Sequence, residues 1–207
     1  MAVSTGMSKV TSHIAVSADG YSAGPNQSLD NPLGEDGIRV HEWHVSPPLE
    51  PVDAEINAEI VDHGAFIMGR NMFGPIRGDW PDEEWKGWWG PEPPYHAPVF
   101  VLTHYARESV VMAGGTTFHF VTDGIESALK QARDAAGDRS VAVAGGASTV
   151  QQFIRAGLLD ELNMHIAPVI LGAGERLLDN VGHPTLEPVN VRSSPRATHI
   201  TYRITYP

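Results

Sequence analysis

Short runs of apolar residues, rich in valine, isoleucine and aromatic side chains, recur along the chain between polar or glycine-containing segments. Runs of about four to eight such residues are typical of β-strands. The run at 141–144 contains no polar residue, which favours a strand buried on both faces. The whole pattern predicts strands at residues 9–16, 65–68, 98–102, 117–121, 141–144, 161–169, 186–193 and 197–205.

Three of the intervening segments carry the spacing of helices. In the first, Ile56, Ile60 and Val61 share one face. The second follows Asp123, a candidate N-cap, and Gly157 ends the third. We therefore predict helices over residues 52–63, 125–135 and 148–156.

Strands and helices alternate along most of the chain. This order predicts an α/β fold, a three-layer α/β/α sandwich whose mostly parallel central sheet carries a C-terminal antiparallel hairpin at its edge. Two long segments, 22–51 and 74–98, lack periodicity, and loops of this length are commonly functional. No repeat or change of composition divides the chain, so we expect one domain over residues 9–207 after a flexible tail at 1–8.

Composition narrows the possible functions. The 207 residues are 42% hydrophobic and 19% charged, which is ordinary for a globular protein. A formal net charge of −11 argues against nucleic-acid binding, which needs clustered lysine and arginine. The absence of cysteine excludes disulfides and thiolate chemistry. No apolar run approaches the roughly 20 residues of a membrane span and no signal peptide is apparent, so we expect a cytoplasmic protein with no membrane partner.

Polar groups follow three of the predicted strands. The dipeptide at 69–70 is Gly-Arg, that at 103–104 is Thr-His, and that at 145–146 is Gly-Gly. In an open α/β sheet, ligands bind outside the carboxyl ends of the strands. We therefore expect these three strand ends to surround one binding crevice.

The glycine pair at 145–146 is the most informative of the three. A strand leads into the pair, and small polar residues begin a helix after it. Without a Cβ, backbone N–H groups approach an anion closely, and the helix N-terminus adds about half a positive charge. The full G-x-G-x-x-G fingerprint is absent, and a tight turn alone explains such a pair about as often.

Two other clusters have alternative interpretations. His41 and His44 suggest a metal site, but no third ligand is identifiable and the H-E-x-x-H motif is absent. We predict no metal there. The tryptophans between Trp80 and Trp89 either stack on a planar heterocycle or anchor a long loop to the core, and anchoring is the commoner use.

Several segments occur in an order shared with a known family. They are Ile14–Tyr21, Ile67–Phe73, Val101–Thr103, Val143–Ala147, Leu158–Leu162 and Ala167–Gly174. On these motifs the chain resembles the dihydrofolate-reductase-like superfamily. The branch it resembles most is the C-terminal reductase domain of the bifunctional riboflavin-biosynthesis deaminase/reductase. The last two segments are the most specific, and the match runs from Lys9 to Asp179.

The resemblance implies an NADPH-dependent reductase, similar to 5-amino-6-(5-phosphoribosylamino)uracil reductase or dihydrofolate reductase, that acts on a small heterocyclic or carbonyl substrate as a homodimer. In this assignment, residues 145–149 cradle the pyrophosphate, residues 103–104 lie near the adenosine end, and Pro168 and Gly172 shape the floor beside the reacting ring. Asp19 is a candidate catalytic residue, although an Asp-Gly turn explains it equally well. The implied cofactor-binding residues are Ala15, Gly20, Gly69, Arg70, Asn71, Thr103, His104, Gly145, Gly146, Ala147, Ser148, Thr149, Pro168 and Gly172.

Two features depart from the family pattern. True folate reductases place a carboxylate in a helix soon after the first strand, and residues 22–51 offer no matching position. The cysteine ligands of the deaminase half have no counterpart, because the sequence contains no cysteine. The proton donor is therefore unassigned. The alternative is a non-catalytic nucleotide- or ligand-binding protein with the same fold.

Overall fold

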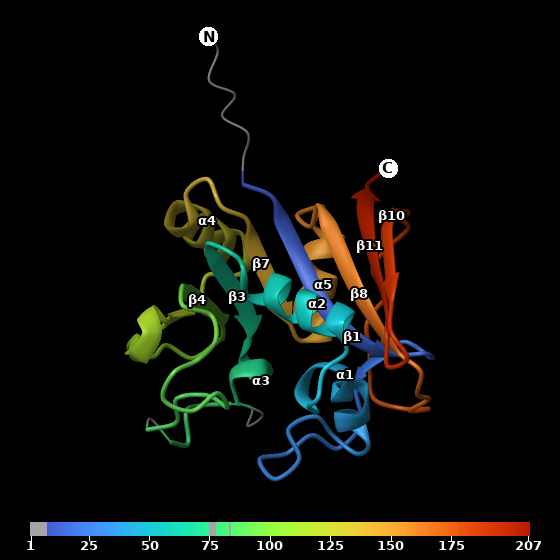
Figure 1. The fold of residues 1–207 in the computed structure, drawn as a ribbon. Coiled ribbons are helices and arrows are strands. Elements are labelled where there is room, and N and C mark those ends of the chain that lie inside the picture. Colours follow the sequence, from blue (N-terminus) through green and yellow to red (C-terminus); the bar gives the residue numbers. More distant parts are fainter. Residues whose placement is uncertain (1–7, 75–77, 83) are drawn as a thin grey trace.

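The computed structural model describes residues 8–74, 78–82 and 84–207, so all but Ser8 of the predicted N-terminal tail lies outside it. A nine-stranded sheet forms the centre of the molecule (Figure 1), in the order β10-β11-β8-β1-β7-β3-β4-β6-β5. A small second sheet pairs β2 (Tyr21–Ala23) with β9 (Glu175–Arg176). The strands of the large sheet are β1 Val10–Ser17, β3 Ala65–Gly69, β4 Pro98–Leu102, β5 Val110–Val111, β6 Thr117–Val121, β7 Val141–Gly145, β8 Glu161–Ala167, β10 Thr185–Ser193 and β11 Thr198–Thr205.

Most neighbouring strands of the large sheet run parallel. The six central strands β8, β1, β7, β3, β4 and β6 pair in parallel. At one edge, β10 and β11 form an antiparallel hairpin that pairs with β8. At the other edge, the short strand β5 pairs antiparallel with β6. The predicted fold class, with its C-terminal antiparallel hairpin, is therefore confirmed.

Helices cover both faces of the sheet. In Figure 1, α1 and α2 lie in front of it and α4 and α5 lie behind it. The helices are α1 Glu42–Val45, α2 Pro51–Val61, α3 Arg70–Phe73, α4 Ile125–Ala136 and α5 Ala147–Arg155, with 3-10 turns η1 Gly37–Val40 and η2 Ala113–Gly115. All three helices predicted from periodicity are present, and every end lies within two residues of its predicted position.

The main hydrophobic core lies between the sheet and the helices α4 and α5. Successive side chains of a strand point to opposite faces, so Val10, Ile14 and Val16 of β1 all enter this core. Leu129 of α4 and Phe153 of α5 pack against the same core from the helix side. Burying one such side chain contributes about 1.5–3 kcal/mol, which explains why these segments keep their apolar periodicity.

The opposite face of the sheet carries two smaller cores. One contains Phe66, Val99 and Phe118 from the β3-β4-β6 half of the sheet, and the tryptophan-rich segment 78–97 packs against it. Trp89 stacks on Phe118 with ring centroids 5.7 Å apart. Trp85 Nε1 donates a hydrogen bond of 2.8 Å to the backbone of α3. The structure thus supports the anchoring interpretation of these tryptophans.

The second small core lies on the β1-β11 half of the same face. It combines Ala15 of β1 and Ala197, just before β11, with Val40, Trp43 and Ile56 from η1, α1 and α2. Between the two small cores the sheet is left partly uncovered, and this is where the candidate site lies.

Two local predictions need correction. Asp123 does not cap α4: the N-cap is Gly124, whose φ of 90° suits glycine, and no side-chain cap bond forms. Residues 22–51 are not wholly irregular, because β2, η1 and α1 lie within or overlap them. Elements of three or four residues are too short to show a period. In the described part of the chain, no helix has the length and apolar character needed to cross a membrane.

Candidate functional site

A crevice of about 1110 Å³ opens between the two small cores and extends to the carboxyl ends of β3, β4 and β7. It is the larger of the two most prominent hollows in the described part of the molecule. The three strand ends singled out from the sequence meet there, as expected for an open α/β sheet. Ten of the predicted site residues line it: Ala15, Gly69, Arg70, Asn71, Thr103, His104, Gly146, Ala147, Ser148 and Thr149.

The remaining predicted residues do not line the crevice. Gly145 ends β7 directly before it, and Gly20, Pro168 and Gly172 lie in the turns beyond β1 and β8. Their roles in cofactor binding stay predictions.

Asp19 has a structural task in the same turns. Its carboxylate accepts hydrogen bonds from the backbone N–H of Leu171 (3.1 Å) and Gly172 (2.7 Å) and from the Ser17 hydroxyl (2.6 Å). These bonds, the Ser17 bond first, lower the pKa of Asp19 to about 2. Asp19 thus ties the turn after β1 to the loop after β8, and its catalytic role stays a prediction.

The junction of β7 and α5 matches its sequence pattern. Gly145 adopts φ +126°, a conformation that side chains disfavour, and the peptide bond to Gly146 is cis. Gly146 is the N-cap of α5. A Cβ on Gly146 would meet no atom within 4 Å, so the backbone here faces open space in the crevice. The first amides of a helix lack intrahelical acceptors and attract anions.

Gly69 permits a close approach of two elements. A Cβ at Gly69 would overlap the Thr149 hydroxyl of α5. Thr149 is buried, so the end of β3 and the start of α5 lie against each other only because residue 69 has no side chain. This contact brings two of the predicted strand ends together.

Arg70 is half-buried and already has partners. Its guanidinium lies 3.5 Å above the Trp80 ring, and Nη1 donates 2.8 Å to the Gly74 carbonyl. Its Nε is buried and has no partner among the described residues. Burial, followed by the charge of Arg107, lowers the pKa of Arg70, but guanidinium stays charged in proteins. The structure therefore gives Arg70 a packing role and leaves one donor unused beside the crevice.

The third strand end, that of β4, presents one buried and one exposed side chain. The Thr103 side chain is buried, and its hydroxyl accepts 3.1 Å from the Tyr105 N–H, which shapes the turn after β4. His104 is exposed at the crevice rim. The backbone of this turn is therefore fixed while the imidazole is open to solvent.

Both long segments contribute to the crevice walls. Gln27, Leu33 and Ile38 approach from one side, and Trp88 and Tyr95 from the other. The sequence indicated these segments by their length and, in the second one, by its tryptophans.

Sequence reasoning missed a group of aromatic and imidazole side chains on the crevice floor. His13 and His165, from neighbouring strands, line it together with Trp43 of α1. Trp43 is 1% exposed, and its Nε1 has no hydrogen-bond partner among the described residues. A buried donor without a partner is costly unless a ligand supplies an acceptor. The signal that could have revealed this group is a histidine in each of the strands β1, β8 and β11, at positions whose side chains point to the same face of the sheet.

His41 and His44 also line the crevice. Their rings are joined by a hydrogen bond of 3.1 Å between Nδ1 of His41 and Nε2 of His44. Within residues 8–74, 78–82 and 84–207, no group of three or more potential ligands is placed to hold a metal ion. The pair is therefore a polar part of the crevice wall.

Burial keeps these imidazoles neutral at physiological pH. It lowers the pKa of His13 to about 3 and that of His44 to about 4, each with a smaller contribution from a neighbouring histidine. It also lowers the pKa of His165 well below the usual histidine value. A neutral imidazole has one donor and one acceptor nitrogen, so each can accept or give a proton.

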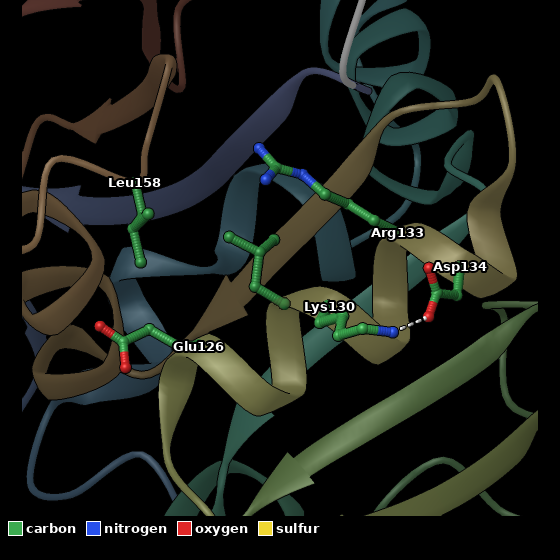
Figure 2. Close-up of a pocket in the computed structure, with 6 residues that line it drawn as sticks. Glu126, Lys130, Arg133, Asp134 and Leu158 are labelled. Carbon is green, nitrogen blue, oxygen red and sulfur yellow. Dashed lines mark hydrogen bonds and ion pairs between the residues drawn. The ribbon is translucent and has the colours of Figure 1, made fainter.

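A second hollow, of about 270 Å³, lies on the outer surface of α4. Figure 2 shows Glu126, Lys130 and Asp134 along the helix, with Leu158 beside it. Lys130 and Asp134 form an exposed ion pair of 2.6 Å, which is worth little in water. The hollow is small and open, and none of the predicted site residues lines it, so the crevice is the better candidate site.

Comparison with known proteins agrees with the geometry. The family model of the RibD C-terminal domain matches residues 8–200. A search of curated proteins finds no match to this chain.

Solved structures give further likenesses. A candidate riboflavin biosynthesis protein from Shewanella sp. PV-4 has a TM-score of 0.65 and 21% identity, over 96% of this chain and 99% of that one. Riboflavin Biosynthesis Reductase Rib7 from Saccharomyces cerevisiae has a TM-score of 0.58 and 14% identity, over 96% and 90%. Dihydrofolate reductase from Enterococcus faecalis, complexed with NADP(H), has a TM-score of 0.57 and 14% identity, over 97% and 98%. At such identities the likeness shows a shared fold.

Proposed function

The chain belongs to the RibD C-terminal domain family, a family of small-molecule reductases of the riboflavin-pathway type, and on that premise we propose that it is an NADPH-dependent reductase. Its substrate is a small heterocycle, related to a pyrimidine or pterin, or a carbonyl compound. The observation that carries the proposal is the meeting of the three strand ends, 69–70, 103–104 and 146–149, in one crevice.

The residues at these strand ends fit a dinucleotide. The open space at Gly146, at the start of α5, accommodates a phosphate against backbone N–H groups. Arg70 has an unused buried donor, and Thr103 and His104 offer polar groups at the neighbouring strand end. When bound, the cofactor supplies a hydride. The chain's own residues bind it, orient it and exclude water.

The substrate occupies the part of the crevice next to α1. The floor there is Trp43 with His13 and His165, and the wall is His41 and His44. An apolar ring with neutral donors and acceptors around it suits an uncharged heterocycle with carbonyl and N–H groups. The unpartnered Trp43 Nε1 is a donor available for one substrate oxygen.

Titration with NADPH and NADH, followed by melting temperature, tests the proposal. A ligand that binds only the folded state stabilises it by about 2.7 kcal/mol at a hundredfold excess over the dissociation constant. We expect saturable stabilisation by NADPH, and then NADPH oxidation with a pyrimidine, pterin or dicarbonyl acceptor. Stabilisation by NADH alone would keep the reductase and change its cofactor. No response to either nucleotide would favour the non-catalytic ligand-binding alternative.

We also propose that the protein is a homodimer. The outer edge of β10 supports this, because Val189 and Val191 are 42% and 59% exposed on the last strand of the sheet. Light scattering should give twice the 22.4 kDa mass of one chain. A mass of one chain at micromolar concentration would contradict the proposal.

A further inference from the structure

A continuous chain of hydrogen bonds leads from the crevice floor to a carboxylate buried beneath α2. His13 Nδ1 lies 3.2 Å from His165 Nε2, and His165 Nδ1 lies 3.0 Å from His199 Nδ1. His199 Nε2 lies 3.0 Å from Asp53 Oδ1. We propose that this chain is a proton relay, which delivers to the crevice the proton that a reduction consumes, with His13 as the donor. The proposal rests on the proposed reductase function and extends it.

The sheet register builds the relay. His165 and His199 are direct partners across the antiparallel pair β8-β11. His165 also pairs with Ala15 on the parallel neighbour β1, two residues beyond His13 on the same face. Rings at these positions stand side by side on one face of three adjacent strands. Asp53, in the first turn of α2, is fully buried against His199.

The far end of the relay reaches the surface. The Ser194 hydroxyl donates 3.1 Å to Asp53 Oδ2. Ser194 is half-buried in the turn between β10 and β11, on the side of Asp53 away from His199. The chain therefore connects solvent to the crevice through residues that no predicted cofactor contact includes.

Each imidazole bridges its two neighbours, so the chain has only two complete proton arrangements. With Asp53 ionised, the carboxylate only accepts, which places the protons on His199 Nε2, His165 Nδ1 and His13 Nδ1. With Asp53 protonated, all three tautomers reverse, and His13 Nε2 carries a proton. We call these the discharged and loaded states.

One turnover converts the loaded state into the discharged state. The N–H bond at His13 Nε2 breaks as a new O–H or N–H bond forms on the substrate, and a bound nicotinamide cofactor would supply the hydride that the adjacent substrate carbon takes up. His13 Nδ1 takes a proton from His165 Nε2, and His165 Nδ1 takes one from His199 Nδ1. His199 Nε2 takes the proton of Asp53. A solvent proton entering at the Ser194 side restores the carboxylic acid, and the loaded state returns once each imidazole has moved its N–H to its other ring nitrogen, so charge and protons balance over the cycle.

The charges around the relay favour neutral imidazoles. His13 faces His63, Glu59 of α2 and Arg192 of β10, and burial has the largest effect on its pKa. Glu59 and Arg192 pair through two hydrogen bonds of 2.8 and 2.6 Å, so their charges largely offset each other.

His165 faces His13, His199, His44 and Arg192, and each of these lowers its pKa further after burial. A neutral histidine at this position can pass a proton without holding a charge. A cationic one would carry the cost of a buried charge.

Nuclear magnetic resonance of the ¹⁵N-histidine protein tests the relay without turnover. We expect the Nδ1 and Nε2 shifts of His13, His165 and His199 to change together with a single common midpoint, as coupled sites do. Asp53→Asn keeps an oxygen that can accept a hydrogen bond from His199 Nε2. In this variant the three rings should keep the tautomers of the discharged state at every pH. Rings that titrate independently, or a variant that still switches, would overturn the relay.

Enzyme kinetics provide a second test of the relay. General acid catalysis contributes about 10²–10⁴-fold, so His13→Gln and Asp53→Asn should lower kcat about a hundredfold with unchanged NADPH affinity. The solvent deuterium isotope effect on kcat should increase in both. The matched control is His183→Gln, because His183 is an exposed histidine outside the crevice. Unaltered kcat in both relay variants would contradict the proposal.

Together, the resonance and kinetic experiments distinguish failure of the relay from failure of the reductase function. If the wild-type protein neither binds NADPH nor turns over, the proposed function fails, and the resonance measurement alone decides whether the histidines switch as a unit. If the protein reduces a substrate while the rings titrate independently, the function holds and the relay is wrong.

Discussion

At the residue scale, single glycines decide what the crevice can hold. Gly146 faces open space, whereas Gly69 lies against the buried Thr149 of α5. Both stand at strand ends that the sequence marked in the same way. Only their surroundings distinguish a glycine that leaves room for a ligand from one that leaves room for the protein itself.

Gly146→Leu tests the first of these roles. The new side chain projects into the crevice and meets no protein atom near its Cβ, so we expect the melting temperature to change little. NADPH affinity should fall at least about a hundredfold, because the side chain fills the space of the phosphate and displaces it from the backbone donors. Isothermal titration gives the affinity. An unchanged dissociation constant would remove the pyrophosphate cradle from the model of the site.

At the element scale, backbone hydrogen bonds fold the segment 22–37 back on itself. Gly24 N donates 2.9 Å to Leu33 O, and Glu35 N donates 2.8 Å to Pro25 O. The turn before β9 approaches so closely that a Cβ on Gly174, at φ +131°, would overlap the Ala23 carbonyl oxygen. The crevice wall formed by this segment therefore depends on a glycine some 150 residues away in sequence.

Gly174→Ala should weaken the packing of segment 22–37 against the turn before β9. Backbone strain of about 1–3 kcal/mol adds to the overlap with the Ala23 carbonyl, so unfolding by urea should show a loss of at least about 2 kcal/mol. Limited proteolysis should cut within residues 22–37 faster than in the wild type. Gly182→Ala is the control, since Gly182 also has positive φ (+79°) but open space around it, and we expect a loss of about 1 kcal/mol there. Equal losses in the two variants would show that the close approach contributes nothing.

At the scale of the whole molecule, the buried histidines make stability depend on pH. Burial lowers the folded-state pKa of His13 to about 3 and of His44 to about 4, and it lowers that of His41, His63 and His165 as well. The unfolded chain takes up protons at these positions near pH 6.5, but the folded chain does not. Acid therefore favours the unfolded state through all of them together.

The free energy of unfolding should be greatest above pH 6.5 and decrease as pH falls toward 5. The slope is about 1.4 kcal/mol per pH unit for each histidine that stays neutral in the folded state. Urea unfolding at pH 7.5, 6 and 5 measures it, in a range above the ordinary titration of carboxylates. His44→Asn should reduce the slope and the exposed His183→Gln should not. A free energy that is constant over this range would mean that the imidazoles are accessible to protons in the folded protein.

The sequence by itself determined the longer strands and helices and the three strand ends. Valine-rich runs such as 141–144 and the face shared by Ile56 and Ile60 are local signals, and burial of their apolar side chains gives them the same meaning in any compact fold. Strand ends needed one general rule, that parallel strands present their carboxyl ends at one edge of the sheet. With this rule, Gly69, Thr103 and Gly146 could be predicted to meet.

Only the tertiary structure decided the crevice floor and the relay. His13, His165 and His199 come from strands as far apart in sequence as positions 13 and 199, and their contact depends on which strands are neighbours and in which register. Asp53 resembles an ordinary acidic residue in the first turn of a helix until α2 is packed on the sheet. A shift of register by one residue would turn every one of these rings to the opposite face. Contacts that depend on register between distant strands leave no periodic trace in the sequence, which is why the structure was needed to find them.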